Sequence, residues 1–378
     1  MDRVQRQEVP EKLGRYRVLT KIGEGGMAIV YLGMRLGPAI AEDDDKFVAI
    51  KVIKDEYAHR EDFVTMFLDE VKIVASLKHP SIVRLLEFGQ EGKRLYCAIE
   101  LVMGQSLYKV WDACRMRKSR LRYDWLAYVG ARIAEGLHAA HELKGPNGNN
   151  LGFVHRDMSP SNVLVSYDGR IKIIDFGLAK AEHRLSRTMA GTVKGKYAYM
   201  APEQAATSNV DRRTDIFSLG VTLWELSVDK RLFKKKDDVD TLIAVNACNV
   251  PDPCGLVWGY PRPLWRVLRR ALRKEPEKRF QTALEMAQEL DAYAKLEGRS
   301  LAQKDVSAVM RALFPLEAEN DEAMLDQASE ASEALEVGRT SISRMSIDPA
   351  STGETAIAPA EWRAQLPAGL LNERKPKR

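Results

Sequence analysis

The feature that most constrains the fold is a central segment in which three oxygen-bearing side chains stand at defined intervals. Asp157 comes first, Asn162 follows it, and Asp175 ends the segment. Between the last two, residues 162–165 and 170–174 read as a pair of short strands joined by a turn. The pattern therefore predicts a loop, a hairpin and a second Asp held at the end of the hairpin.

These three side chains suit the transfer of a phosphoryl group. Asp157 can accept the proton of a substrate hydroxyl, and Asn162 and Asp175 can hold Mg²⁺ against the phosphates of a nucleotide. This reaction requires little covalent chemistry from the protein. It needs a nucleophile in line, neutralised phosphates and a base in position.

Other motifs stand in a fixed order around this segment. A glycine-rich stretch, 22–30, precedes Val48-Ala49-Ile50-Lys51, and Ala201-Pro202-Glu203 follows Asp175-Phe176-Gly177. A glycine-rich loop alone is weak evidence, but this many motifs in order do not arise by chance. Residues 14–297 resemble the eukaryotic-type (Hanks-type) protein kinase superfamily, and within it the bacterial serine/threonine kinases.

The resemblance implies an α+β, bilobal fold. A small β-rich lobe with one helix would cover residues 14–103, and a larger, mainly helical lobe would cover 104–297. We expect a flexible arm over 1–13, a helical extension over 298–337 and a disordered tail with Ser and Thr over 338–378. In the extension, the apolar residues form one helical stripe that Pro315 ends: Leu301, Val306, Val309, Met310, Leu313 and Phe314.

The resemblance also implies a site for ATP. Lys51 would bridge the α- and β-phosphates, and Glu70 would orient Lys51 through an ion pair. Backbone groups of Glu100 and Val102 would hydrogen-bond the adenine. The other residues expected to line the nucleotide site are Ile22, Gly23, Glu24, Gly25, Gly26, Val30 and Ala49.

Ala28 stands where the family carries the third glycine of the loop, and two further departures from the family pattern concern catalysis. Ser159 stands where serine/threonine members usually carry Lys, and Lys196 stands where they usually carry Thr. Because a hydroxyl and an ammonium have changed places, we expect Lys196 to lie beside Asp157 as a catalytic residue that neutralises the transferring phosphoryl group. The alternative is a slow kinase in which Lys196 faces solvent.

Regulation is expected in the segment between Asp175 and the Ala201-Pro202-Glu203 motif. In the family, the cation at the position of Arg156 pairs with a phosphate on this segment and orders it. Thr188 and Thr192 are the expected phosphorylation sites.

Four further residues are expected to support the fold. His155 should be a packed structural histidine, and Asp215 should bind the backbone of residues 155–162, the catalytic loop, from below. Glu203 and Arg279 should form a buried ion pair.

Composition bears on the other classes of function. The chain has 378 residues, enough for a two-lobed core with extensions, and its four Cys lack metal-ligand spacing. No apolar run approaches the roughly 20 residues that span a bilayer, and no signal peptide is evident. We therefore expect a cytoplasmic protein without a transmembrane segment. The net charge of +5 is modest, and nucleic-acid binding is not expected because no binding motif accompanies the basic residues of 262–279.

These observations predict a bacterial serine/threonine protein kinase that uses ATP and Mg²⁺, autophosphorylates its activation segment and acts in signal transduction. Its partners would be protein substrates and a second copy for trans-autophosphorylation. Two alternatives stay open. One is a pseudokinase scaffold, against which the intact Lys51, Asp157, Asn162 and Asp175 argue. The other is a tyrosine or dual-specificity kinase, since Lys196 before the substrate-docking loop is also typical of tyrosine kinases.

Overall fold

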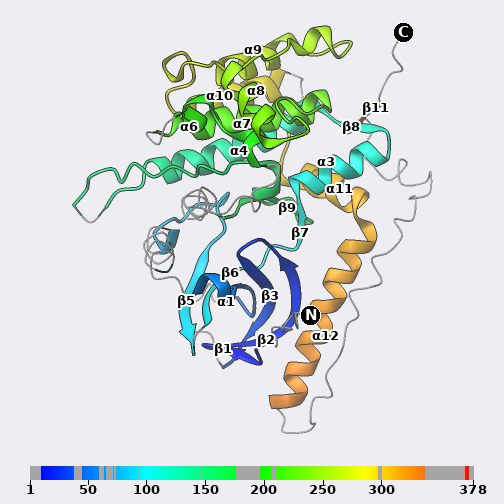
Figure 1. Cartoon of the computed structure of the whole chain (residues 1–378). Coiled ribbons are helices and arrows are strands. Elements are labelled where there is room, and N and C mark those ends of the chain that lie inside the picture. The colour runs from blue at the N-terminus through cyan, green and yellow to red at the C-terminus, as the bar shows by residue number, and fades with distance from the viewer. Residues whose placement is uncertain are drawn as a thin grey trace, which may run out of the picture. The chain divides into compact units, whose positions relative to one another are not determined.

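The computed structural model (Figure 1) describes most of the chain in two compact units. The described residues are 10–37, 45–58, 64, 71, 74–92, 94–145, 147–175, 196–206, 210–296, 300–336 and 371–373. Unit 1 contains residues 1–71, 84–102 and 316–360, and unit 2 contains residues 72–83, 103–315 and 361–378.

Unit 1 is built on a six-stranded antiparallel sheet with the order β1-β2-β3-β4-β6-β5. Helix α1 (Asp55–Ala58) follows the fourth strand, and most of α12 (Pro315–Glu336) belongs to the same unit. The strands are β1 (Lys12–Leu13), β2 (Tyr16–Glu24), β3 (Ala28–Arg35), β4 (Phe47–Ile53), β5 (Leu85–Glu91) and β6 (Arg94–Glu100).

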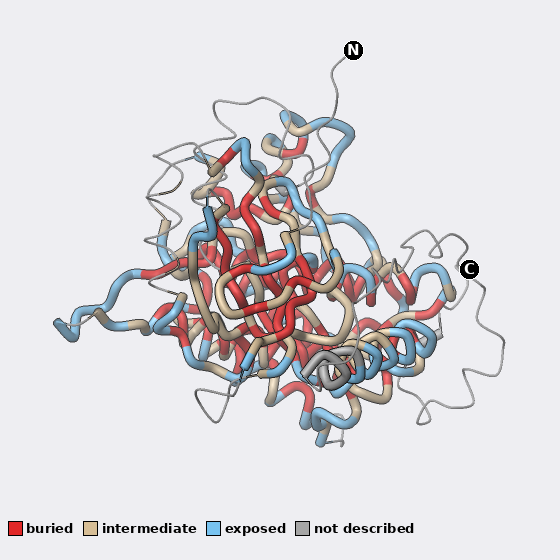
Figure 2. The backbone as a smooth tube through the Cα atoms, turned by 90° about the horizontal axis from the view of Figure 1, so that it is seen from below, coloured by how far each residue is buried: buried red, intermediate tan, exposed pale blue. Residues whose placement is uncertain are grey.

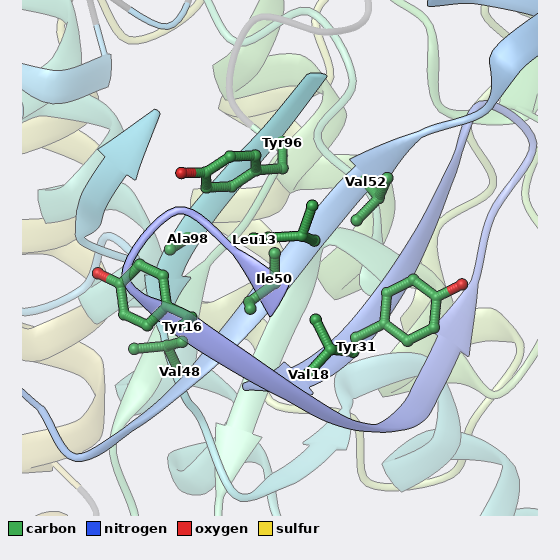
Figure 3. Packing of buried hydrophobic residues seen from close by; sticks show 9 residues of the cluster. All are labelled: Leu13, Tyr16, Val18, Tyr31, Val48, Ile50, Val52, Tyr96 and Ala98. Carbon is green, nitrogen blue, oxygen red and sulfur yellow. The ribbon is translucent and has the colours of Figure 1, made fainter. Parts of the chain in front are cut away.

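Alternation along β4 places its apolar side chains on the core face of this sheet. Val48, Ile50 and Val52 are buried and pack with Tyr16 and Tyr96 in the cluster drawn in Figure 3. Such burial of large apolar side chains contributes roughly 1.5–3 kcal/mol each. The sheet therefore holds Lys51, which lies between two of these core residues in sequence, on its opposite face.

Unit 2 is mainly helical and is centred on α7 (Arg213–Val228). Residues 214–228 of this helix are all buried. Figure 2 colours the backbone by burial, with the buried residues of the described chain in red. Helix α4 (Tyr123–His141) packs on α7 and on α10 (Ala283–Leu296), and Gly130 permits close approach because a Cβ there would lie 2.7 Å from Leu223 Cδ1. The other helices are α3 (Leu107–Met116), α6 (Pro202–Ala206), α8 (Asp238–Ala247), α9 (Arg262–Ala271) and α11 (Gln303–Leu313).

A three-stranded antiparallel sheet of order β10-β9-β7 completes unit 2 and holds the predicted hairpin. Its strands are β7 (Gly104–Ser106), β9 (Val163–Ser166) and β10 (Ile171–Ile173). The β-rich first unit and the helical second unit agree with the predicted α+β class. Among the described residues, no helix is both long and apolar enough to span a bilayer.

The tail contains one strand that its composition did not predict. Residues Leu371–Glu373 form β11, which pairs antiparallel with β8 (Ser119–Leu121). The expectation of disorder over 338–378 therefore does not extend to these residues. Their pairing satisfies backbone groups along β8, a partner far away in sequence that no local pattern indicates.

Candidate active site

Asp215, in the first turn of α7, fixes the start of the catalytic loop. Its buried carboxylate accepts the backbone N–H of His155 (2.8 Å to Oδ2) and of Arg156 (2.8 Å to Oδ1). His141 Nε2 lies 2.7 Å from Oδ2. Burial by itself would raise the pKa of Asp215, but the hydrogen bonds and charge of His141 and the backbone bonds lower that pKa overall. The predicted backbone tie is thus confirmed.

His155 is buried and has a defined tautomer. Its Nδ1 accepts the N–H of Asp157 at 3.2 Å, so the ring proton lies on Nε2, which donates to Ile174 O at 3.1 Å. Both ring nitrogens are therefore committed to the backbone. This geometry agrees with the predicted structural role and joins the catalytic loop to the end of the hairpin.

Arg156 adopts the left-handed region with φ of 67°, an uncommon conformation for a side chain of this size. Its N–H is held by Asp215, and its carbonyl accepts Gln204 Nε2 at 2.8 Å. Gln204 lies in α6, directly after the Ala201-Pro202-Glu203 motif. Both backbone polar groups of the residue before Asp157 are thus fixed by different helices, which supports the strained conformation.

Asp157 and Asn162 are in direct contact. Asn162 Nδ2 donates to Asp157 O at 2.7 Å and to Asp157 Oδ2 at 2.9 Å. Since both partners are acceptors, the atom bonded to them is the amide nitrogen, and Oδ1 of Asn162 is the atom that could bind a metal ion. Asn162 ends the 3₁₀ turn Pro160–Asn162 and enters β9 directly.

Asp175 lies at the same end of the hairpin as Asn162. Ile174 N donates to Asn162 O at 3.0 Å, and Asp175 has φ of 60°. Ile173 is fixed by backbone bonds to Ser81 O at 2.8 Å and from Val83 N at 3.0 Å. A carboxylate and an amide oxygen held at one end of a hairpin fit Mg²⁺, which prefers hard oxygen ligands and takes the rest from water and phosphate.

In unit 1, the strands place the predicted nucleotide-binding residues side by side. Lys51 on β4 pairs with Val30 on β3 and with Cys97 on β6. The glycine-rich turn closes through Gly25 N to Ala28 O at 2.8 Å. Glu100 ends β6 in register with Val48 of β4, and its N–H donates to Arg84 O at 2.9 Å.

Glu24 carries a strongly stabilised charge in this turn. Its carboxylate pairs with Lys21 and with Lys54, the latter at 2.9 Å. Hydrogen bonds from Lys21 and then Lys54 lower the pKa of Glu24 to about 2. Glu24, the last residue of β2, therefore stays ionised at neutral pH and joins the start of the glycine-rich turn to Lys54, which directly follows β4.

Several predicted site residues lie outside the described part of the chain. Lys196 begins the 3₁₀ turn Lys196–Tyr199, but its side chain is not among those described. The exchange with Ser159 therefore stays a prediction. The remaining residues of this kind are Glu70, Phe176, Gly177, Thr188 and Thr192.

The Glu203–Arg279 ion pair is present and buried at Arg279. The two residues form a bidentate pair, with both nitrogen–oxygen distances at 2.7 Å. The other N–H groups of Arg279 donate to carbonyls of Arg273, Arg213 and Lys274, which uses all of its donors. This prediction is confirmed, and the pair fixes the residue next to Gln204.

Two residues that help to hold the catalytic loop, His141 and Gln204, were not predicted from the sequence. His141 stands one helical turn after Leu137 on the buried face of α4, so its position on the apolar stripe is a signal that could have indicated it. Gln204 gives no such signal, because its role depends on a contact with a distant carbonyl.

Comparison with known proteins identifies the class. Residues 16–290 match the family model described as "Protein kinase domain". The chain belongs to this family.

Among the relatives, the tyrosine-protein kinase MasK of Myxococcus xanthus is 38% identical over 74% of this chain and 43% of its own sequence. The serine/threonine-protein kinase PrkC of Bacillus subtilis is 31% identical over 77% of this chain and 43% of its own length. The chain thus spans less than half the length of these two relatives. In solved structures, the kinase domain of Mycobacterium tuberculosis PknI matches with a TM-score of 0.57, at 23% identity, over 76% of this chain and 99% of that one, which supports the fold.

Proposed function

We propose that the chain is a protein kinase that transfers the γ-phosphate of ATP to Ser or Thr hydroxyls of proteins. The observation that carries the proposal is the contact of Asp157 with Asn162 at the end of a hairpin that also bears Asp175. The bonds of Asp215 and His155 to the backbone hold the loop against the hairpin, which supports the assignment of Asp157 as a base and of Asn162 and Asp175 as oxygen ligands. Phosphoryl transfer requires this combination.

Each residue has a separate role in this proposal. Asp157 accepts the proton as the substrate oxygen bonds to the γ-phosphorus and the bond from that phosphorus to the β,γ-bridging oxygen breaks, releasing ADP. Asn162 Oδ1 and the Asp175 carboxylate would hold Mg²⁺, and the bound ion would neutralise charge on the phosphates. Lys51, oriented by Glu70, binds the α- and β-phosphates, and backbone groups of Glu100 and Val102 bind adenine.

The test is incorporation of radiolabelled phosphate from [γ-³²P]ATP into the chain and into a generic protein substrate. Wild-type protein should label both in the presence of Mg²⁺, and Lys51→Met should reduce labelling to background. Lys12→Met is the matched control, because Lys12 is an exposed lysine on β1 of the same sheet. Wild-type protein that incorporates no labelled phosphate at all Mg²⁺ concentrations tested would overturn the proposal in favour of a scaffold without kinase activity.

A second candidate is tyrosine or dual specificity. It is favoured by the relative named as a tyrosine-protein kinase, which is 38% identical to this chain, and by Lys196 before the docking segment. Phosphoamino-acid analysis of the labelled protein separates the two. We expect phosphoserine and phosphothreonine, whereas phosphotyrosine as the main product would support the second candidate. A rate of self-labelling per molecule that rises with protein concentration would indicate trans-autophosphorylation between copies.

A further inference from the structure

Helix α11 lies beyond the residues that match the family, 16–290, yet it is packed as a core element of unit 2. Val306, Val309 and Met310 are 0% exposed and Leu313 is 1% exposed. Their spacing places them on one face of the helix, which lies against α3 and β9 (Figure 1). The extension is thus joined to the sheet that carries the catalytic hairpin.

Polar contacts connect α11 to the turn between β9 and β10. Ser307 Oγ donates to Tyr167 O at 2.6 Å, and Gln303 Nε2 donates to Asp168 O at 3.1 Å. At the other end of α11, Arg117 Nη2 from the end of α3 donates to Leu313 O at 2.8 Å. Two carbonyls of the hairpin turn therefore depend on side chains of α11.

The third residue of the turn fits against the helix without room for a side chain. Gly169 has φ of +89°, and a Cβ there would lie 2.0 Å from Gln303 O and 2.9 Å from Ser307 N. Because these are backbone atoms, the clash could be relieved only by moving the turn or the helix. The position requires glycine for two reasons, the left-handed conformation and the contact.

The same hairpin carries the proposed metal ligands at its other end. Asn162 immediately precedes β9, and Asp175 follows β10 by two residues. The strands are in register through Val165↔Ile171 and Val163↔Ile173 and are short, so a shift of the turn is carried along both strands. Tyr167 N also donates to Met103 O at 2.9 Å, which fixes the turn from the side of β7.

We propose that α11 is a positioning element of the catalytic unit: by holding the β9–β10 turn through Ser307 and Gln303, it sets the placement of Asn162 and Asp175. Ser307 and Gln303 are positioning residues and do not contact the reacting atoms. The inference rests on the proposed function in one respect, the assignment of Asn162 and Asp175 as metal ligands.

The test compares full-length Gly169→Ala and Ser307→Ala with Gly148→Ala. Gly148 is a matched control, since its φ is +76° but a Cβ there meets nothing within 4 Å. Hydrogen exchange of the amides of Ser166 and Ile173 reports on the hairpin, because these amides donate to Arg170 O and Ser81 O. The concentration of Mg²⁺ that gives half-maximal phosphate transfer reports on the ligands.

We expect exchange at Ser166 and Ile173 to be about fivefold faster in Ser307→Ala, the effect of one lost hydrogen bond, and about tenfold or more faster in Gly169→Ala. Exchange in α7 should stay unchanged in both, and the required Mg²⁺ should rise severalfold. Gly148→Ala should match the wild type. The proposal would be overturned if the hairpin amides of both test variants exchanged at the same rate as those of Gly148→Ala. It would also be overturned if exchange were faster but the Mg²⁺ requirement stayed unchanged, provided that Asn162→Ala does change that requirement.

Asn162→Ala separates this inference from the proposed function. If Asn162→Ala leaves the Mg²⁺ requirement unchanged, the assignment of the metal ligands is wrong, and hydrogen exchange alone then decides whether α11 holds the hairpin. If Gly169→Ala does not fold, Ser307→Ala still decides, because it removes one hydroxyl and introduces no clash.

Discussion

At the scale of single residues, Asp215 determines the shape of the catalytic loop. One buried carboxylate accepts two successive backbone N–H groups and contacts His141, and those N–H groups belong to the two residues before Asp157. Successive amides can point to one acceptor only if the chain turns sharply, which agrees with the left-handed φ of Arg156. The position of the proposed base thus follows from a residue of another helix.

Asp215→Asn should destabilise unit 2 and disturb the loop. The amide NH₂ of Asn would point at one or more of the N–H groups that now donate to the carboxylate, and two donors cannot form a hydrogen bond. We expect this to lower the free energy of unfolding by an amount on the order of 3 kcal/mol. Urea denaturation measures this cost. Asp240→Asn, at an exposed position of α8, is the control and should change the free energy of unfolding little.

The same variant predicts a pH dependence. The pKa of Asp215 is lower in the folded protein than the value of about 3.9 expected for the unfolded chain. The contribution of the carboxylate is therefore complete above pH of about 4 and is lost as the pH falls through the folded pKa. The difference in unfolding free energy between wild type and Asp215→Asn should shrink from neutral to acid pH. A difference that grows toward acid would contradict this account.

Lys196→Ala tests the exchange with Ser159. If the ammonium stabilises the transferring phosphoryl group, its removal should lower kcat on the order of 10²-fold while changing the KM for ATP much less. The double variant Ser159→Lys with Lys196→Thr restores the usual family arrangement and should recover part of the loss. Unchanged turnover in Lys196→Ala would favour a lysine that faces solvent.

At the scale of elements, much of the site could be predicted from sequence because it depends on local patterns. The strands predicted over 162–165 and 170–174 occur as Val163–Ser166 and Ile171–Ile173. The apolar stripe that Pro315 ends occurs as α11, which stops at Leu313. Apolar residues that recur with a period of 2 indicate a strand, and those that recur with a period of 3.6 indicate a helix. The same residues show which face of the strand or helix is buried.

The remaining features depend on contacts between distant segments. Gln204 bonds the carbonyl of Arg156, Ser307 bonds the carbonyl of Tyr167, and β11 pairs with β8. In each case the partner is a backbone group, which every residue possesses, so the partner's sequence gives no indication of the contact. Such contacts become visible only when the packing is known.

The segment between Asp175 and Lys196 should be phosphorylated in active protein. Arg156, beside the proposed base, is a cation suited to a phosphate dianion, and Thr188 or Thr192 is the expected acceptor. Mass spectrometry of wild-type protein should find the phosphate, and Asp157→Asn protein produced in parallel should lack it. Active wild-type protein without phosphate at residues 186–192 would show that Arg156 has another partner.

At the scale of the whole molecule, the chain divides into two compact units. Each unit has its own core, and α11 belongs to the core of unit 2 although it follows the residues that match the family. A description of the catalytic domain that stopped at residue 290 would omit the helix that bonds the hairpin turn.

A chain that ends after Pro315 should keep most of its turnover, since α11 and its bonds to the hairpin turn remain. A chain that ends after residue 297 should lose most activity because it lacks α11. Steady-state phosphate transfer by the two truncated chains, at equal folded concentration by circular dichroism, checks both statements. Background activity in the longer chain would show that α12 or the tail completes the enzyme.

The most direct test of the central claim, that Asp157 is the base of a phosphotransferase, is a single-turnover measurement on Asp157→Asn with [γ-³²P]ATP, Mg²⁺ and excess enzyme. Nucleotide binding, measured by titration calorimetry, should stay within a few-fold of the wild type, because Asp157 does not hold ATP. Phosphate transfer should fall on the order of 10²-fold or more, in the range expected for loss of a general base. Transfer at a rate close to that of the wild type would contradict the assignment.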